Sequence, residues 1–153
     1  MSESPDALPV PHPTPVSAPF WEAAARGELT SQRCRDCGRY VFIPQEFCRY
    51  CHSFSLEWVR VAGRGTVYSY STVWRPQTPA FDTPYVVAII ELAEGYKMLS
   101  NLVECDETEV HVGMSVEVTF RRRGSEIVLP MFRPASRAEA GQSRKEREQV
   151  ESA

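Results

Sequence analysis

Four cysteines form two pairs with the same internal spacing. Cys34 and Cys37 make one Cys-x-x-Cys pair, and Cys48 and Cys51 make a second pair after ten intervening residues. Two residues between the cysteines of a pair let both sulfurs point at one ion, so four thiolates can surround a tetrahedral metal at about 2.3 Å. Gly38 eases the turn after the first pair. The pattern predicts a closed metal site that leaves no position for substrate or water, and therefore an architectural metal.

Other uses of these thiols stay open at this point. Disulfide bonds need an oxidising compartment, whereas the N-terminus carries acids and prolines where a secretory signal would have a basic start and an apolar stretch. A redox-active iron site would use the same four sulfurs, because neither ligand softness nor tetrahedral geometry separates iron from zinc. His52, beside the last cysteine, is an alternative ligand. We expect zinc, bound by the four cysteines.

The sequence contains no residue set that is typical of a catalytic site. Cys105, the fifth cysteine, lies among acidic residues, which raise the pKa of a thiol and so oppose its use as a nucleophile. The three histidines, His12, His52 and His111, have no plausible nucleophile beside them in an apolar setting. We expect Cys105 to be an incidental thiol and the neighbouring acids to form a solvated patch.

Arginines at two places are candidate contacts for a phosphate. Arg64 stands between two glycines, where close backbone approach and a positive charge can seat a phosphate. A glycine bulge that opens a twisted barrel strand explains the same residues. Arg121, Arg122 and Arg123 form a positive cluster at a predicted strand end. This cluster suits a phosphate or an acidic partner, with a solvated hairpin tip as the simpler alternative.

The spacing of apolar and turn residues predicts a mostly β protein with a small barrel. Strand patterns follow one another without a convincing helix between them, and glycines lie in or near the gaps. The strand patterns cover Leu56 to Val61, Gly65 to Trp74, Tyr85 to Leu92, Lys97 to Val103, Ser115 to Arg121 and Ile127 to Phe132. Within the second of these, Tyr68, Tyr70 and Trp74 share a face that is either core, which we favour, or a base-stacking surface. The residues between the two cysteine pairs alternate like a strand, as in a zinc-ribbon hairpin.

A short helix is predicted from Pro19 to Gly27. Strong helix formers lie in its middle, and Gly27 is placed to end it. Two turns are too short to be stable alone, so Phe20 and Trp21 must pack either on the protein's own core or on a partner's surface. We expect these two residues to bind a partner.

The two ends of the chain differ from its middle. The first 19 residues hold six of the twelve prolines, and residues 137–153 mix basic and acidic side chains with one large aliphatic residue, Val150. We expect both ends to be unstructured arms. The net charge is -3, and no apolar run reaches the roughly 18 residues of a membrane span. Because nucleic-acid binding needs clustered positive charge, we expect neither nucleic acid nor membrane as a partner, and a cytoplasmic location.

The order of the motifs resembles a known family. Phe20-Trp21-Glu22, the two cysteine pairs, Gly63-Arg-Gly-Thr-Val-Tyr-Ser69 and the strand that begins at Pro84 are similar to zinc-ribbon OB-fold proteins that were first described as a domain of unknown function. The resemblance runs from about Phe20 to Pro134 and implies an N-terminal helix, a rubredoxin-like zinc ribbon and a five-stranded OB barrel. It also implies a partner, because these proteins are commonly encoded with thiolase-like enzymes. The complexes handle acyl-CoA thioesters, and steroid side-chain retro-aldolases are among them.

These inferences combine into an expected domain plan and function. We expect a proline-rich arm (1–19), a helix (20–30), a zinc ribbon (31–55), an OB fold (56–135) and a charged tail (136–153). The leading hypothesis is a non-catalytic accessory subunit of a thiolase-like acyl-CoA enzyme, either an acyltransferase or a lyase of the aldolase type. Arg64 and the arginines from 121 to 123 would contact the acyl-CoA. A single-stranded nucleic-acid binder and an iron-containing electron carrier are the alternatives.

Overall fold

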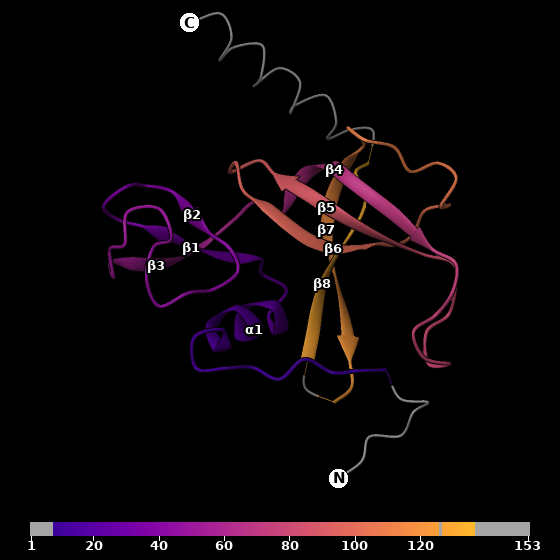
Figure 1. The fold of residues 1–153 in the computed structure, drawn as a ribbon, viewed down its shortest axis with the longest axis horizontal. Coiled ribbons are helices and arrows are strands. Elements are labelled where there is room, and N and C mark those ends of the chain that lie inside the picture. The colour runs from indigo at the N-terminus through magenta and orange to yellow at the C-terminus, as the bar shows by residue number, and fades with distance from the viewer. Residues whose placement is uncertain (1–7, 126, 137–153) are drawn as a thin grey trace, which may run out of the picture.

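The computed structural model describes residues 8–125 and 127–136. These residues form one helix and eight strands, arranged as a small sheet beside a closed barrel (Figure 1). The elements are α1 (Ala18–Ala25), β1 (Thr30–Cys34), β2 (Tyr40–Val41), β3 (Leu56–Arg60), β4 (Arg64–Val73), β5 (Tyr85–Leu92), β6 (Lys97–Leu102), β7 (Ser115–Arg123) and β8 (Ile127–Pro134). The predicted class, a mostly β protein with an N-terminal helix, a ribbon and a five-stranded barrel, is confirmed.

The barrel consists of β4, β5, β6, β8 and β7 in spatial order, and β7 closes it onto β4. Neighbouring strands are antiparallel except β6 and β8, which meet in parallel at Leu102 and Phe132. Because side chains alternate along a strand, every second residue of β5 points inward, and Val86, Ala88 and Ile90 are buried. The alternation that predicted this strand in the sequence is therefore the alternation that fills the barrel.

The small sheet has β1 in its centre, between β2 and β3. β3 pairs with the whole of β1, from Thr30 opposite Arg60 to Cys34 opposite Leu56. The predicted domain plan places this strand in the barrel, beyond a ribbon that ends at residue 55. The strand belongs to the ribbon sheet instead, because β1 satisfies its backbone groups along its full length. A partner so far back in the chain leaves no mark on the local residue pattern.

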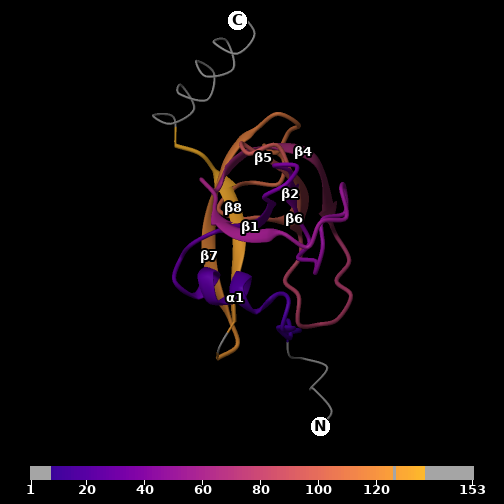
Figure 2. The same cartoon turned by 90° about the vertical axis from the view of Figure 1, so that its left-hand side faces the viewer.

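The helix α1 is short, and it is stabilised by the protein's own core. Pro19 stands in its first turn, where a missing N–H costs nothing, and Gly27, with φ of 76°, follows its end. Phe20 is 6% exposed and belongs to the main hydrophobic cluster, and the half-buried Trp21 meets its ring edge-on at 5.1 Å between centroids. The helix lies beside β8 at one end of the barrel (Figure 2). No helix among the described residues is long and apolar enough to cross a membrane.

Aromatic rings join the ribbon to the barrel. The Tyr40 ring from β2 stacks on Tyr96 at 5.5 Å between centroids, and Phe42 lies 5.8 Å from Tyr96 and 5.9 Å from Phe20. Because Tyr96 belongs to the turn between β5 and β6, these contacts connect three parts of the chain. The ribbon is therefore packed against the rest of the protein rather than tethered to it.

The N-terminal arm has a defined path from residue 8 onward. Val10 lies against the β7–β8 hairpin, where a Cβ at Gly124 would come within 3.3 Å of its side chain. Thr14 and Ser17 exchange hydrogen bonds that close a turn just before α1. That the arm is unstructured, as expected from its prolines, stays a prediction. Residues 1–7 and the charged tail from residue 137 lie outside the described residues.

Candidate metal centre

The four predicted metal ligands come together in the ribbon. The Sγ atoms of Cys34, Cys37, Cys48 and Cys51 all lie within 4.8 Å of one another. Two of the distances, Cys34 to Cys51 and Cys37 to Cys48, are 3.6 Å. Four sulfurs at about 2.3 Å around a tetrahedral ion would be about 3.8 Å apart, so the thiols already have nearly the spacing that a metal requires.

Two similar turns position the sulfurs. The N–H of Gly38 donates to the carbonyl of Cys34 at 2.9 Å, and the N–H of His52 donates to the carbonyl of Cys48 at 2.8 Å. The residue that closes each turn has a positive φ, 73° at Gly38 and 62° at His52. His52 thus occupies the place in the second turn that a glycine occupies in the first. The cluster of candidate ligands contains the four cysteines and not His52.

The electrostatics of the cluster call for a cation. Burial raises the pKa of the Cys48 thiol, but the backbone N–H groups of Tyr50 and Cys51 and the neighbouring thiols outweigh it and bring the pKa to about 7. A backbone hydrogen bond at Ser53 lowers the pKa of Cys51, but burial and the three other sulfurs raise it to about 12. Four thiolates so close together therefore cannot coexist without a positive charge between them, and a divalent metal supplies that charge.

Apart from its sheet and its aromatic contacts with the barrel, the ribbon has little to stabilise it. Its own hydrophobic cluster consists of Cys34, Val41 and Cys48, with Leu56 packed against it. Gln32 joins the sheet to the segment just before the second turn. Its side-chain amide donates to the carbonyl of Gln45 at 2.9 Å, and its side-chain oxygen accepts from the Gln45 N–H at 2.7 Å. With all four coordination positions taken by sulfur, the metal has an architectural role.

The glycines beside Arg64 are explained by packing. A Cβ at Gly63 would lie 2.3 Å from Cγ1 of Val118, and a Cβ at Gly65 would lie 2.4 Å from the backbone oxygen of Glu91. Both glycines therefore let β4 approach its neighbours. The alternative that these glycines open a barrel strand therefore explains them. The bulge-like irregularity of that strand does not lie at the glycines but further on, between Val67 and Ser69. Arg64 is exposed, and its contact with a phosphate stays a prediction.

The three consecutive arginines line one cavity, and two of them also make polar contacts within the protein. Arg121 bonds to Glu104 at 3.0 Å, and Arg122 donates to the carbonyl of Ser125 at 2.9 Å. All three line an open cavity of about 470 Å³ together with apolar side chains of the arm and of β8. Arg64 is not part of this lining, because it lies opposite Glu117 further along β7. The structure therefore brings together three of the four predicted phosphate contacts.

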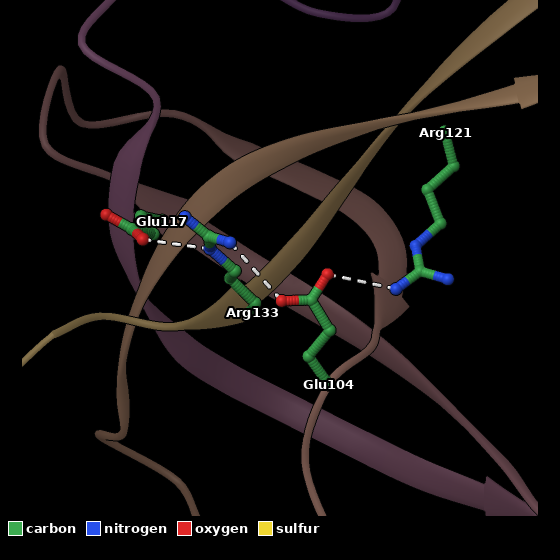
Figure 3. A network of polar contacts seen from close by, with 4 residues as sticks. All are labelled: Glu104, Glu117, Arg121 and Arg133. Atoms are coloured by element: carbon green, nitrogen blue, oxygen red, sulfur yellow. Dashed lines mark hydrogen bonds and ion pairs between the residues drawn. The ribbon is translucent and has the colours of Figure 1, made fainter.

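A network of charged side chains on the barrel surface was not foreseen from the sequence. Figure 3 shows Glu104 between the guanidinium groups of Arg121 and Arg133, with Glu117 on the other side of Arg133. Hydrogen bonds from Arg133 and then Arg121 hold the pKa of Glu104 below its usual range. These partners are far apart in the sequence, so no local motif could have revealed them.

Three aromatic side chains of the β4 region are exposed instead of buried. Tyr68 is 52% exposed, Tyr70 39% and Trp74 65%, so the favoured prediction that they form core is wrong. Tyr68 directly follows the buried Val67, so alternation along β4 points it outward, where the Lys97 ammonium lies 4.3 Å from its ring centroid.

The surroundings of the fifth cysteine raise the pKa of its thiol, as predicted. Cys105 is half-buried outside the metal cluster. Burial raises the pKa of its thiol, and the carboxylates of Glu109, Asp106 and Glu107 raise it further. Its neighbour Asp106 is engaged in a local turn, in which it accepts hydrogen bonds from Thr108.

A ribbon with four thiol ligands joined to a five-stranded barrel defines a class of protein, and comparison with known proteins agrees. Residues 21–57 match the family model of the ChsH2 rubredoxin-like zinc ribbon domain, and residues 58–121 match that of the ChsH2 C-terminal OB-fold domain. The Ltp2-ChsH2(DUF35) aldolase contains a chain of solved structure that is 38% identical, with a TM-score of 0.77. The alignment covers 83% of this chain and all of that one. The chain belongs to the DUF35 family.

Relatives with known names are subunits or scaffold proteins. A probable enoyl-CoA hydratase alpha subunit of Thermomonospora curvata is 42% identical over 76% of this chain, which spans only 37% of that relative's length. A DUF35 domain-containing scaffold protein of Methanocaldococcus jannaschii is 40% identical over 61% of this chain and 68% of its own. The benzoylsuccinyl-CoA thiolase subunit BbsA of Geobacter metallireducens is 34% identical over 52% of this chain and 57% of its own.

Proposed function

We propose that this chain is a non-catalytic accessory subunit of a thiolase-like enzyme that acts on acyl-CoA. A retro-aldolase of steroid side chains is the first partner to test. Two observations together carry the proposal. The chain has a closed four-thiol metal site, and its fold is similar, over the whole of the solved chain, to a subunit of an aldolase complex. The names of the hydratase, scaffold and thiolase relatives support the same role.

The chemistry of the reaction would belong to the partner. All three histidines of the chain, His12, His52 and His111, are exposed among the described residues. The cysteine outside the metal cluster has a raised pKa. The metal has no free coordination position for a substrate. These observations favour a subunit that shapes or stabilises an active site over one that contains it.

Trp21 is the residue of α1 that is available to the partner. Phe20 fixes the helix from inside, since its ring is buried, and the half-buried Trp21 beside it keeps part of its surface exposed. A rigid helix that presents part of an indole suits an interface, where tryptophan often dominates the binding energy. The docking role predicted for the pair is therefore proposed for Trp21, with Phe20 as its support.

The cavity at the β7–β8 hairpin is the proposed place of contact with acyl-CoA. Leu129 and Met131 give it an apolar wall, and Arg122 and Arg123 line it without an ion pair to a described carboxylate. Such a combination suits a ligand that carries both phosphate and an apolar chain. Arg64, on β4 opposite Glu117, lies outside this cavity and would reach a different part of the same ligand.

Co-purification tests the proposal. The chain is co-expressed with a thiolase-like enzyme, and complex formation is measured by gel filtration with light scattering. We expect a stable complex that Trp21→Ala weakens, whereas Tyr68→Ala, an aromatic truncation on the barrel, leaves it intact. Replacing both Arg122 and Arg123 by glutamine should weaken acyl-CoA binding about tenfold without breaking the complex, whereas Arg75→Gln should not. A chain that stays monomeric in the presence of the thiolase-like enzyme, and leaves that enzyme's activity unchanged, contradicts the proposal.

A further inference from the structure

The second cysteine turn of the ribbon carries aromatic side chains that the fold does not bury. Phe54 is 79% exposed, Tyr50 47% and Phe47 41%. The rings of Phe47 and Phe54 lie 6.0 Å apart, so two of the three form a single apolar surface. Apolar rings exposed together in this way mark a site of interaction more often than an accident of packing.

Two arginines lie against one of these rings, Tyr50, without a carboxylate of their own. The guanidinium carbons of Arg39 and Arg49 lie 4.8 Å and 5.6 Å from the ring centroid of Tyr50. Neither arginine is in an ion pair with a described residue, unlike Arg35 with Glu57 and Arg60 with Glu28. The ribbon, residues 30–60, carries five arginines against three acidic residues, whereas the whole chain has a net charge of -3. The ribbon therefore has a local excess of positive charge, and two of its arginines outside ion pairs lie beside an exposed ring.

The metal site would hold this surface in one shape. Cys48 lies between Phe47 and Arg49 in the sequence, and Cys51 follows Tyr50, so the exposed residues alternate with metal ligands. The Tyr50 N–H donates to Cys48 Sγ at 3.4 Å, which ties the backbone of the turn to the cluster. A surface on a rigid turn loses little conformational entropy on binding.

We propose that this surface, Arg39, Phe47, Arg49, Tyr50 and Phe54, here called the aromatic knuckle, docks a protein that presents carboxylates beside an apolar pocket. Phe54 enters the pocket, and the two arginines meet the carboxylates at its rim. The inference rests on the proposed function, because it names a second surface through which an accessory subunit engages its complex. It differs from the docking role of Trp21 in position and in chemistry.

A single-stranded nucleic acid is the less favoured occupant. Binding to a phosphate backbone needs a groove of several cations, and the knuckle has two free ones on a chain of net negative charge. The Phe47 and Phe54 planes are inclined by 58°, so they form a wedge rather than a platform on which successive bases stack.

The test uses the full chain, loaded with zinc, and the thiolase-like enzyme of the co-purification experiment. Dissociation constants are measured for Phe54→Ser and Arg49→Glu, with Leu99→Ser and Arg75→Glu as controls. Leu99 is as exposed as the knuckle rings, and Arg75 is an exposed arginine remote in sequence from the ribbon. We expect each knuckle variant to raise the dissociation constant about tenfold or more, Phe54→Leu to retain most of the affinity, and both controls to bind like the original chain. Arg49→Glu should also reduce the dependence of the association rate on salt. One zinc per chain in every variant shows that the ribbon remains folded.

The outcomes separate the two proposals. If the complex forms but all knuckle variants bind normally, the knuckle is not a docking surface, although the accessory role stands. If no complex forms at all, both the accessory role and the docking role are overturned. If the chain binds a single-stranded oligonucleotide at low salt and Phe54→Ser abolishes this, the knuckle serves nucleic acid and the proposal is wrong.

Discussion

The entry of β4 into the barrel gives a prediction that can be worked out from atomic contacts. Gly63 has a φ of 69°, its carbonyl accepts a hydrogen bond of 2.7 Å from the Val118 N–H, and a Cβ there would lie 2.3 Å from Val118 Cγ1 and 3.2 Å from its Cβ. Gly65 needs no positive φ, but a Cβ there would lie 2.4 Å from the Glu91 carbonyl oxygen. The first clash involves a side chain that can be shortened, and the second involves backbone.

We expect Gly63→Ala to lower the free energy of unfolding by about 2–5 kcal/mol. Overpacking of this kind costs about 1–3 kcal/mol, and an alanine in the left-handed region adds about 1–2 kcal/mol. Val118→Ala removes the Cγ1 atom responsible for the closest contact. The double variant should therefore be more stable than the sum of the two single effects by about 1 kcal/mol or more. Gly65→Ala should gain nothing from Val118→Ala, because the shortened side chain does not touch the Glu91 oxygen.

Urea unfolding of the zinc-loaded variants measures these differences, provided that the slopes of the transitions agree. Two results would refute the packing argument. One is strict additivity of Gly63→Ala and Val118→Ala, and the other is a Gly65→Ala variant as stable as the original chain. In either case the glycines would be needed for something other than packing, and the phosphate-seat hypothesis for Arg64 would become the better explanation.

Two further predictions concern the metal and the surface charges. Removal of the metal with a chelator, or Cys48→Ser, should unfold the ribbon sheet while the barrel strands persist, because the ribbon's own buried cluster is too small to replace the ordering effect of the metal. Hydrogen exchange resolved by segment, together with zinc content, measures this difference. An equal loss of protection in β5 would contradict the prediction. Glu104 has a lowered pKa in the folded state, so its contribution to stability is present above the ordinary carboxyl pKa and is lost as pH falls through the lower folded value. Glu104→Gln should therefore flatten the acid side of the stability profile, measured as urea midpoints between about pH 7 and pH 3, and an unchanged profile would show that the pairs with Arg133 and Arg121 contribute nothing.

Local features of the chain could be predicted from the sequence. The spacing of Cys34, Cys37, Cys48 and Cys51 identified the metal ligands, because the geometry of each turn depends only on residues within it. The barrel strands were found within about two residues of their bounds, since alternation and glycine turns are also local signals. The short helix was foreseen for the same reason.

Features that depend on distant partners could not be predicted. The partner of β3 is β1, and no local pattern distinguishes a ribbon strand from a barrel strand. The exposure of Tyr68 depends on which face of β4 the other barrel strands cover, and the residues near it in the chain do not show this. The ion pairs of Glu104 with Arg121 and Arg133 join a loop to two strands, and the burial of Phe20 depends on strands made much later in the chain.

The packing of α1 on β8 sets an order of events during synthesis. The helix is the first described element to leave the ribosome, and the strand it packs against is the last. Both cysteine pairs emerge long before β8, so the ribbon can capture its metal while the barrel is still unfinished. Until the final strand is made, Phe20 can pack only on earlier parts of the chain such as Trp21 and Phe42, so its burial stays incomplete. A message truncated before β8 would yield a chain with a complete metal site and an unseated helix. Such a chain would expose the helix prematurely to chaperones, proteases or the partner enzyme.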